Sequence, residues 1–191
     1  MASFLVEHGA KLFDADAFYR TLVASDGPCM REICTLFGSG ARCADGSLNR
    51  PYISARVFAP SEDAAHLLAE LNRITHHYVR QGYLDWINSM DNPSEALIII
   101  DAPLLYEGKM DAYCDVVIAV IADREKRIQR IVERDGISRE KAMARIDAQT
   151  PDEELMRKAD YVIDNSSDTR SLYEQMNQVI TILPNKKGNM L

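Results

Sequence analysis

The stretch Ala96–Glu107, A-L-I-I-I-D-A-P-L-L-Y-E, decides the fold of this chain. Its first apolar residues follow one another without polar alternation, which is typical of a strand buried on both faces of a parallel sheet. Pro103 cannot donate to a strand ladder, so we expect the strand to end near Asp101. In open α/β sheets, ligands bind beyond the carboxyl ends of the strands, and we therefore place a candidate site around Asp101.

Three other segments have the composition of short strands, and helical patterns separate them. Strands that alternate with helices pair in parallel through right-handed crossovers. We therefore predict one domain over residues 1–191, an α/β fold in which a parallel sheet carries helices on both faces. The three other strand segments are Lys11–Asp14, Asp115–Ala122 and Tyr161–Ile163.

The helical segments are marked by apolar stripes and by capping residues. Over residues 61–90, apolar side chains recur at helical spacing, and we expect two helices with a break near Gly82. Asp123 is a typical N-cap for the next helix, and T-P-D-E at 150–153 has the pattern of a capping box with proline at the first helical position. We expect residues 184–191 to be a frayed tail.

The bulk composition excludes several classes of function. The net charge of −7 argues against non-specific nucleic-acid binding, because a phosphate backbone selects a basic surface. The apolar runs are too short to span a bilayer, so we expect no membrane partner. The four cysteines form no C-x-x-C pair, and we therefore expect reduced thiols in a cytoplasmic protein.

Basic residues gather in one part of this acidic chain. Residues 124–145 contain eight basic and four acidic side chains. Arg127, Arg130 and Arg134 recur at helical spacing, so their guanidinium groups can converge on phosphate oxygens. A solvated helix face is the alternative, since charge runs commonly have that role. A shared nucleotide crevice would also explain the polar residues at the strand ends, which are Asp14, Asp16, Asp101, Asp123 and Asn165.

The order of motifs along the chain resembles that of the dephospho-CoA kinases, a family with the P-loop kinase fold. Each motif is weak by itself, but together they cover nearly the whole chain in one order. The matching motifs are D-A-D at 14–16 with Arg20, F-G at 37–38, D-G-S-L-N-R at 45–50, V-F at 57–58, Leu71 with Ile74 and His76, A-P-L-L-Y-E at 102–107, R-I-V-E-R-D-G-I-S at 130–138, R-I-D-A-Q at 145–149 and A-D-Y-V-I-D-N at 159–165.

The resemblance implies ATP-dependent phosphorylation of the ribose 3′-hydroxyl of dephospho-CoA. Asp16 would then be the base that accepts the hydroxyl proton, while Arg134 and Arg145 would neutralise charge on the transferred group. The resemblance also implies a helical substrate subdomain over 50–92 and a lid over 134–149. A helix N-cap is the alternative interpretation of Asp16, and both roles can hold together.

The resemblance extends to both nucleotides and to a metal ion. Asp101 would hold Mg²⁺ through water, because hard cations prefer oxygen ligands, or it is a plain strand-end acid. A packed helix histidine is the alternative for His76. The matching positions on the dephospho-CoA side are Arg20, Arg50 and His76, and those on the ATP side are Arg130 and Asn165.

The chain departs from the family pattern in three places. His77 stands where the family usually has proline, and no glycine follows Asn165. The third departure is that no G-x-x-x-x-G-K-[ST] motif occurs in the 191 residues. We therefore expect that the first strand and the phosphate loop of the fold are missing, and that the chain as written binds ATP poorly.

Two other functions stay open on the sequence alone. One is a non-catalytic protein that binds CoA or a nucleotide, in which Asp16 and the arginines persist without turnover. The other is a kinase that uses the same lid and phosphorylates another small nucleotide. Dephospho-CoA and ATP are the partners that the resemblance implies, with no nucleic acid and no membrane among them.

Overall fold

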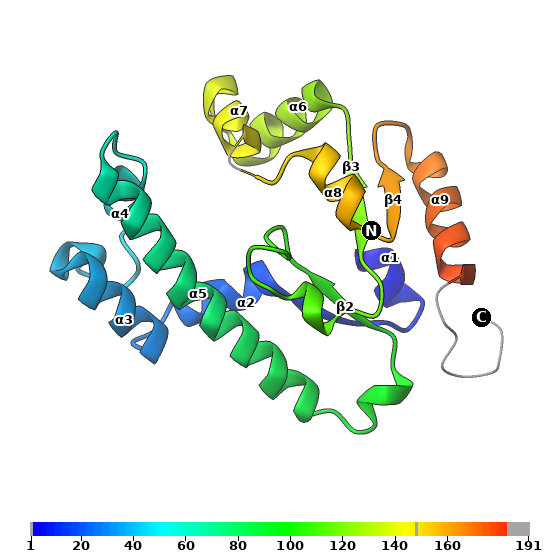
Figure 1. Cartoon of the computed structure of the whole chain (residues 1–191), viewed down its shortest axis with the longest axis horizontal. Coiled ribbons are helices and arrows are strands. Elements are labelled where there is room, and N and C mark those ends of the chain that lie inside the picture. Colours follow the sequence, from blue (N-terminus) through cyan, green and yellow to red (C-terminus); the bar gives the residue numbers. More distant parts are fainter. Residues whose placement is uncertain (1, 148, 183–191) are drawn as a thin grey trace. The chain divides into compact units, whose positions relative to one another are not determined.

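The structure is a computed structural model that describes residues 2–147 and 149–182 (Figure 1). It divides into two compact units, Ala2–Met110 and the part of the chain from Asp111 onward. Each unit has its own parallel sheet and its own apolar core. No helix among the described residues is long and apolar enough to cross a membrane. The tail predicted at 184–191 lies outside the described residues.

The first unit contains the predicted central strand. β1 (Lys11–Asp14) and β2 (Ile98–Asp101) pair in parallel, as predicted, and Asp14 stands opposite Asp101 in the register. Strand pairing thus sets two carboxylates next to each other at one end of the sheet. The helices of this unit are α1 (Ala2–Glu7), α2 (Ala15–Leu22), α3 (Pro28–Phe37), α4 (Arg50–Val57) and α5 (Glu62–Asn88), with 3-10 turns at Ser39–Ala41 and Pro93–Glu95.

The long helix α5 takes part in two apolar clusters. Towards its N-terminus, Ile74 is buried in a cluster with Ile33 of α3 and Ile53 of α4. Towards its C-terminus, Tyr83 is buried in a second cluster with Phe13 of β1. Full burial of one large apolar side chain stabilises a fold by about 1.5–3 kcal/mol. Helix α5 therefore joins the helical part of the unit to the sheet.

The predicted break near Gly82 is wrong. Helix α5 runs without interruption over the 27 residues Glu62–Asn88, and Ser61 is its N-cap. Gly82 lies in its interior because a side chain there would collide with α2: a Cβ would lie 2.0 Å from Cε1 of Phe18. The glycine makes room for an aromatic ring and does not end the helix.

Helix α3 lies in a segment for which we predicted no element. Pro28 stands at the start of the helix, where its missing N–H costs no hydrogen bond. Cys29 and Ile33 are fully buried on the inner face. Burial raises the pKa of the Cys29 thiol to about 11, with a further increase from the charge of Glu32. Cys29 is therefore a core residue, as small thiols often are.

The second unit is built around the other predicted strands. β3 (Ile118–Ile121) and β4 (Tyr161–Asp164) pair in parallel. Asp123 caps α6 as predicted, and its side chain accepts a hydrogen bond of 3.1 Å from the backbone N–H of Lys126. The core holds buried Ile128, Ala142 and Ile146. The helices are α6 (Arg124–Asp135), α7 (Arg139–Asp147), α8 (Asp152–Lys158) and α9 (Thr169–Ile182), with a 3-10 turn at Asp111–Tyr113.

Two further predictions need correction. We predicted one sheet, whereas the described strands form two separate two-stranded parallel sheets. Alternation of strands and helices determines that the pairs are parallel but not which strands pair. The helix predicted after Thr150 also begins one residue later than expected: α8 begins at Asp152, and Pro151 is its N-cap and not its first helical residue.

We expect Gly82→Ala to destabilise the first unit, although alanine normally favours a helix interior over glycine by about 1 kcal/mol. The new methyl group would displace Phe18, whose ring centroid lies 5.4 Å from that of Phe13, and overpacking of this kind costs about 1–3 kcal/mol. Denaturant unfolding measures the difference. Gln81→Ala, at the exposed neighbouring position, is the control. A Gly82→Ala chain more stable than wild type would contradict the packing argument.

Candidate active site

Two acids at the start of α2 have different roles. Asp14 is the N-cap, and its side chain accepts a hydrogen bond of 2.8 Å from the backbone N–H of Ala17. An N-cap carboxylate satisfies one of the amide donors that a helix leaves unpaired at its start. The alternative that Asp16 caps this helix is therefore wrong. Asp16 lies in the first turn with an exposed side chain.

A cavity of about 260 Å³ lies beside Asp16 in the first unit. Its walls come from α2, from α5 and from the segment 102–110 that follows β2. Apolar side chains such as Tyr19 and Leu71 form most of the lining, and His76 is among its few polar residues. A concave, mostly apolar pocket with a small number of polar groups is the usual form of a small-molecule site.

His76 is half-buried in the wall of this cavity. Burial lowers its pKa from 6.5, while a hydrogen bond with the backbone of Glu107 acts in the opposite direction. One turn further along α5, Arg80 donates a hydrogen bond of 3.2 Å to the carbonyl of Gly108. Both side chains thus connect α5 to the segment 102–110. His76 is neutral at neutral pH, and its position agrees with both interpretations made from the sequence.

Asp101 lies among other carboxylates at the end of the sheet. It retains solvent exposure, but the surrounding protein removes part of its hydration, and this desolvation, followed by the charge of Asp14 and then of Asp16, raises its pKa from 3.8. No group of three or more His, Cys, Asp or Glu side chains in residues 2–147 and 149–182 is arranged to hold a metal ion. Mg²⁺ commonly binds one or two carboxylates and keeps several waters, so these acids fit that ion without enclosing it.

The two arginines predicted on the dephospho-CoA side differ in position. Cζ of Arg50 lies 5.7 Å from the ring centroid of Tyr19, which places the cation against an aromatic wall residue of the cavity. Burial raises the pKa of Tyr19, so the phenol stays neutral. Arg20 is exposed in the last turn of α2 and does not line the cavity. The structure therefore groups Asp16, His76 and Arg50, and leaves Arg20 apart.

In the second unit, the two residues predicted on the ATP side are in contact. Nη1 of Arg130 donates a hydrogen bond of 3.1 Å to the backbone carbonyl of Asn165. The next residue, Ser166, accepts a hydrogen bond of 2.7 Å at its Oγ from the backbone N–H of Asp123, and its carbonyl accepts one from Lys126. These bonds attach the loop after β4 to the first half of α6.

Arg134 and Arg145 are brought together by Asp135. Nε of Arg134 lies 2.7 Å from Oδ1 of this carboxylate, and Arg145 of α7 donates to Oδ2. Hydrogen bonding to Arg134 is the main cause that lowers the pKa of Asp135, so the carboxylate is ionised at neutral pH. The predicted convergence of Arg127 with the other arginines is not seen, because Arg127 binds Asp152 at 2.7 Å and Gln149 at 2.9 Å.

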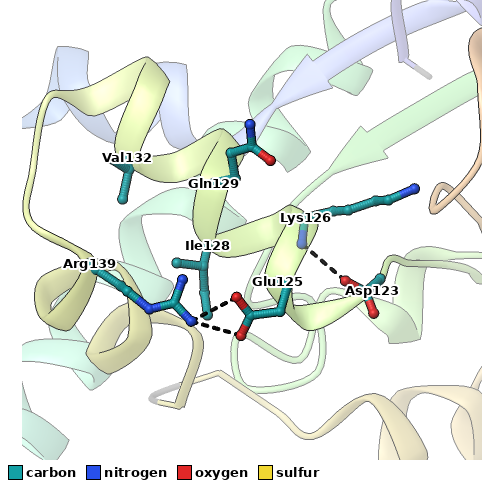
Figure 2. A pocket seen from close by; sticks show the side chains of 7 residues that line it. All are labelled: Asp123, Glu125, Lys126, Ile128, Gln129, Val132 and Arg139. Carbon is teal, nitrogen blue, oxygen red and sulfur yellow. Dashed lines mark hydrogen bonds and ion pairs between the residues drawn. The ribbon is translucent and has the colours of Figure 1, made fainter.

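A second hollow, of about 510 Å³, lies along α6 (Figure 2). Figure 2 shows Arg139 of α7 bound to both carboxylate oxygens of Glu125, at 2.8 and 2.7 Å. Both side chains are more than half exposed, and such a surface pair contributes at most about 1 kcal/mol. None of the predicted site residues lines this hollow, and we assign it no role in catalysis.

Sequence reasoning missed several residues of these groupings. Asn72 and Thr75 line the cavity, but nothing in their spacing distinguishes them from other polar residues of α5. Asp135 lies within the matched motif at 130–138, but we assigned it no role. The signal that could have identified it is an acid adjacent to one predicted phosphate-binding arginine and close in sequence to another.

Comparison with known proteins places the chain among relatives of one kind. A family model described as dephospho-CoA kinase matches residues 1–171. The dephospho-CoA kinase of Syntrophotalea carbinolica is 34% identical over 184 residues, which cover 94% of this chain and 84% of that protein. The dephospho-CoA kinase of Carboxydothermus hydrogenoformans is 35% identical over 179 residues, with the same two coverages of 94% and 84%.

Solved structures agree with this comparison. The dephospho-CoA kinase of Campylobacter jejuni has a TM-score of 0.64 and 25% identity, and the match covers 99% of this chain and 91% of that one. The crystal structure of a Thermus thermophilus protein has a TM-score of 0.76 and 26% identity, with coverage of 96% and 90%. The mixed α/β fold with small parallel sheets is thus shared with these structures.

We expect the pH dependence of stability to report on His76. Its pKa is lowered in the folded chain, so the unfolded chain takes up the proton first as the pH falls through about 6.5, and the free energy of unfolding decreases. Denaturant unfolding at about pH 7.5 and about pH 5.5 measures this decrease. It should be smaller in His76→Gln and unchanged in His77→Gln, the exposed neighbour. Equal decreases in wild type and His76→Gln would refute the lowered pKa.

Proposed function

Because the chain belongs to the dephospho-CoA kinase family and converts dephospho-CoA to coenzyme A by phosphorylation, we propose that its acceptor is the ribose 3′-hydroxyl. As a kinase, it takes the phosphoryl group from ATP. The residues that we propose for the reaction come from the two units described above. One holds Asp16, His76, Arg50 and Asp101, and the other holds Arg130, Arg134, Arg145 and Asn165.

We propose Asp16 as the base that accepts the proton of the attacking hydroxyl. This proposal rests on the different positions of two acids at the start of α2. Asp14 is the N-cap, and Asp16 lines the cavity. Phosphoryl transfer depends mainly on alignment and charge neutralisation. A carboxylate within hydrogen-bond reach of the hydroxyl aligns it and accepts its proton, while cationic groups provide the neutralisation. The cavity beside Asp16 would hold part of dephospho-CoA, with His76 in its wall.

Arg20 and Arg50 would contact anionic groups of dephospho-CoA. Neither lines the cavity, and guanidinium groups at such positions suit the diphosphate of the substrate, because their planar fork matches phosphate oxygens. The helical substrate subdomain over 50–92 is part of this proposal. It would include α4 and α5, whose apolar faces meet in the helical cluster.

On the donor side, Arg130 and Asn165 would bind ATP, and Arg134 and Arg145 would neutralise charge that develops on the transferred group. In support, the arginine and asparagine of the first pair are in contact, and the two arginines of the second pair share a carboxylate. Fixed positive groups at the point where charge develops make a large contribution to phosphoryl transfer. The lid proposed over 134–149 consists of the end of α6 and of α7.

Asp101 would hold Mg²⁺ through water, next to Asp14 and Asp16. Loss of hydration raises the pKa of Asp101 most, and the charges of Asp14 and Asp16 raise it further; a divalent cation would relieve this repulsion. When bound, the ion would neutralise the phosphate oxygens of ATP. That the phosphate loop is missing stays a prediction. The 191 residues contain no G-x-x-x-x-G-K-[ST] motif, and the coding sequence upstream of Met1 can be read for one.

The test of this function is the assay of the chain with dephospho-CoA and ATP, in which mass spectrometry identifies the product and NMR locates the new phosphate. Coenzyme A phosphorylated at the 3′ position is the expected product. Binding of dephospho-CoA without product, also in a chain extended upstream of Met1, would favour the non-catalytic alternative. Phosphorylation of another nucleotide and not of dephospho-CoA would favour the other kinase.

We expect Asp16→Asn to lower kcat by about 100- to 10,000-fold, because loss of a general base removes a contribution of that size. The variant should keep its thermal stability, since Asp14 and not Asp16 caps the helix. Asp63→Asn is the matched control, because Asp63 is an exposed acid in the first turn of α5. Full activity of Asp16→Asn would remove the proposed base.

We expect Asp101→Asn to raise the Mg²⁺ concentration needed for half-maximal activity by about 10- to 100-fold, as the loss of groups that orient a metal's ligands commonly does. Titration of activity with MgCl₂ at saturating ATP measures this shift. Saturating Mg²⁺ should restore most of kcat. A fall in kcat with an unchanged Mg²⁺ requirement would show that Asp101 does not act through the ion.

A further inference from the structure

Asp135, the last residue of α6, is shared by two arginines. Arg134 binds it side-on, with Nε 2.7 Å from Oδ1 and Nη2 3.1 Å from Oδ2, and Arg145 donates to the same Oδ2 through Nη1. We propose that Asp135 is a positioning residue that holds these two guanidinium groups together for the phosphate groups of the bound nucleotide. This inference rests on the proposed function, which assigns both arginines to the transferred group.

The turn after α6 makes the shared contact sterically feasible. Gly136 ends the helix with φ 62, a left-handed conformation that glycine adopts without strain. Helix α7 then packs on α6 around buried Ile128 and Ala142. The small side chain of Ala142, which is completely buried, allows close approach of the two helices. Arg145 therefore reaches a carboxylate that lies ten positions earlier in the chain.

The remaining donors of the two arginines are available to a ligand. No described residue accepts a hydrogen bond from Nη1 of Arg134 or from Nη2 of Arg145. The two arginine side chains are 73% and 56% exposed, whereas Asp135 is only 23% exposed. The carboxylate thus lies beneath the two cations and leaves N–H groups at the surface, where bidentate contacts to phosphate oxygens can form.

A carboxylate between two guanidinium groups also reduces their mutual repulsion. Two like charges at contact distance repel each other, and without Asp135 each long side chain would move into solvent. Preorganised charges are worth more than mobile ones, because no reorganisation is needed when the ligand charge develops. The ion pair Glu125–Arg139 lies on the same two helices and has no proposed role in the site, which makes it a matched control.

The kinetic test uses Asp135→Asn, which keeps the size of the side chain and removes its charge. We expect kcat/KM for ATP to fall by about 10- to 100-fold, because misplacement of a catalytic group commonly costs that much. Glu125→Gln should stay near the wild-type value. In a background that carries both Arg134→Ala and Arg145→Ala, Asp135→Asn should add little, since Asp135 acts through these two arginines. Additive effects, or wild-type kinetics of Asp135→Asn, would overturn the inference.

A binding test works without turnover. Calorimetry measures the affinity of the whole chain for inorganic tripolyphosphate, and thermal melting confirms that each variant is folded. We expect weaker binding by Asp135→Asn and recovery of affinity in Asp135→Glu, which restores the charge. If Asp135 only screened the arginines, its removal would strengthen anion binding, so tighter or unchanged binding overturns the inference.

The two tests separate the inference from the proposed function. A chain that binds tripolyphosphate but does not phosphorylate dephospho-CoA would fail the proposed function, while the comparison of variants would still decide the role of Asp135. A wild-type chain that binds no tripolyphosphate would overturn the inference directly. Should Asp135→Asn not fold, Asp135→Ser takes its place, and binding as tight as that of wild type or tighter would overturn the inference.

Discussion

The continuity of helix α5 is the constraint on which the first unit depends. One rigid element supplies Ile74 to the helical cluster and Tyr83 to the cluster over the sheet. The residues that it gives to the cavity, which are Leu71, Asn72, Thr75, His76 and Val79, lie on both sides of Ile74 and before Tyr83. A break in the middle of the helix would separate the cavity wall from Asp16. Because Gly82 has no side chain, Phe18 fits against α5 at this position. Helix α2, with Asp14 and Asp16 at its start, can therefore lie against α5.

In the second unit, individual ion pairs describe the surface better than the overall excess of basic residues does. The basic segment 124–145 belongs to an acidic chain, and several of its arginines form surface ion pairs, as the interpretation of a solvated face expects. Arg124 pairs with Asp147 and Arg139 with Glu125. Among the ion pairs of the described residues, only those of Arg134 and Arg145 share a single carboxylate, Asp135. The candidate site therefore differs from the rest of this surface in the acid that its arginines bind, and not in the number of basic residues.

The sequence predicted the elements better than their assembly. Apolar runs identified the strands, but the burial on both faces that we expected is not seen: Ile98, Ile99 and Ile100 of β2 are only partly buried. The cap Asp123 was identified because local hydrogen bonds determine it. The error at Gly82 concerns a contact between elements, which no local pattern contains. Helix α3 did carry a local signal that we did not use, since Met30, Ile33 and Phe37 recur at helical spacing after Pro28. Asp16 lines the cavity, and its role as the base stays a prediction; only the structure shows that Asp14, and not Asp16, takes the cap.

The burial of Cys29 affects how readily the protein reacts with oxidants. A thiol whose pKa is about 11 is almost wholly protonated at neutral pH, and Cys114, with a pKa raised by burial to about 11, behaves alike. The protonated thiol is a poor nucleophile, so peroxide and alkylating reagents react slowly with these two positions. We therefore expect oxidative loss of activity to begin at side chains other than Cys29 and Cys114.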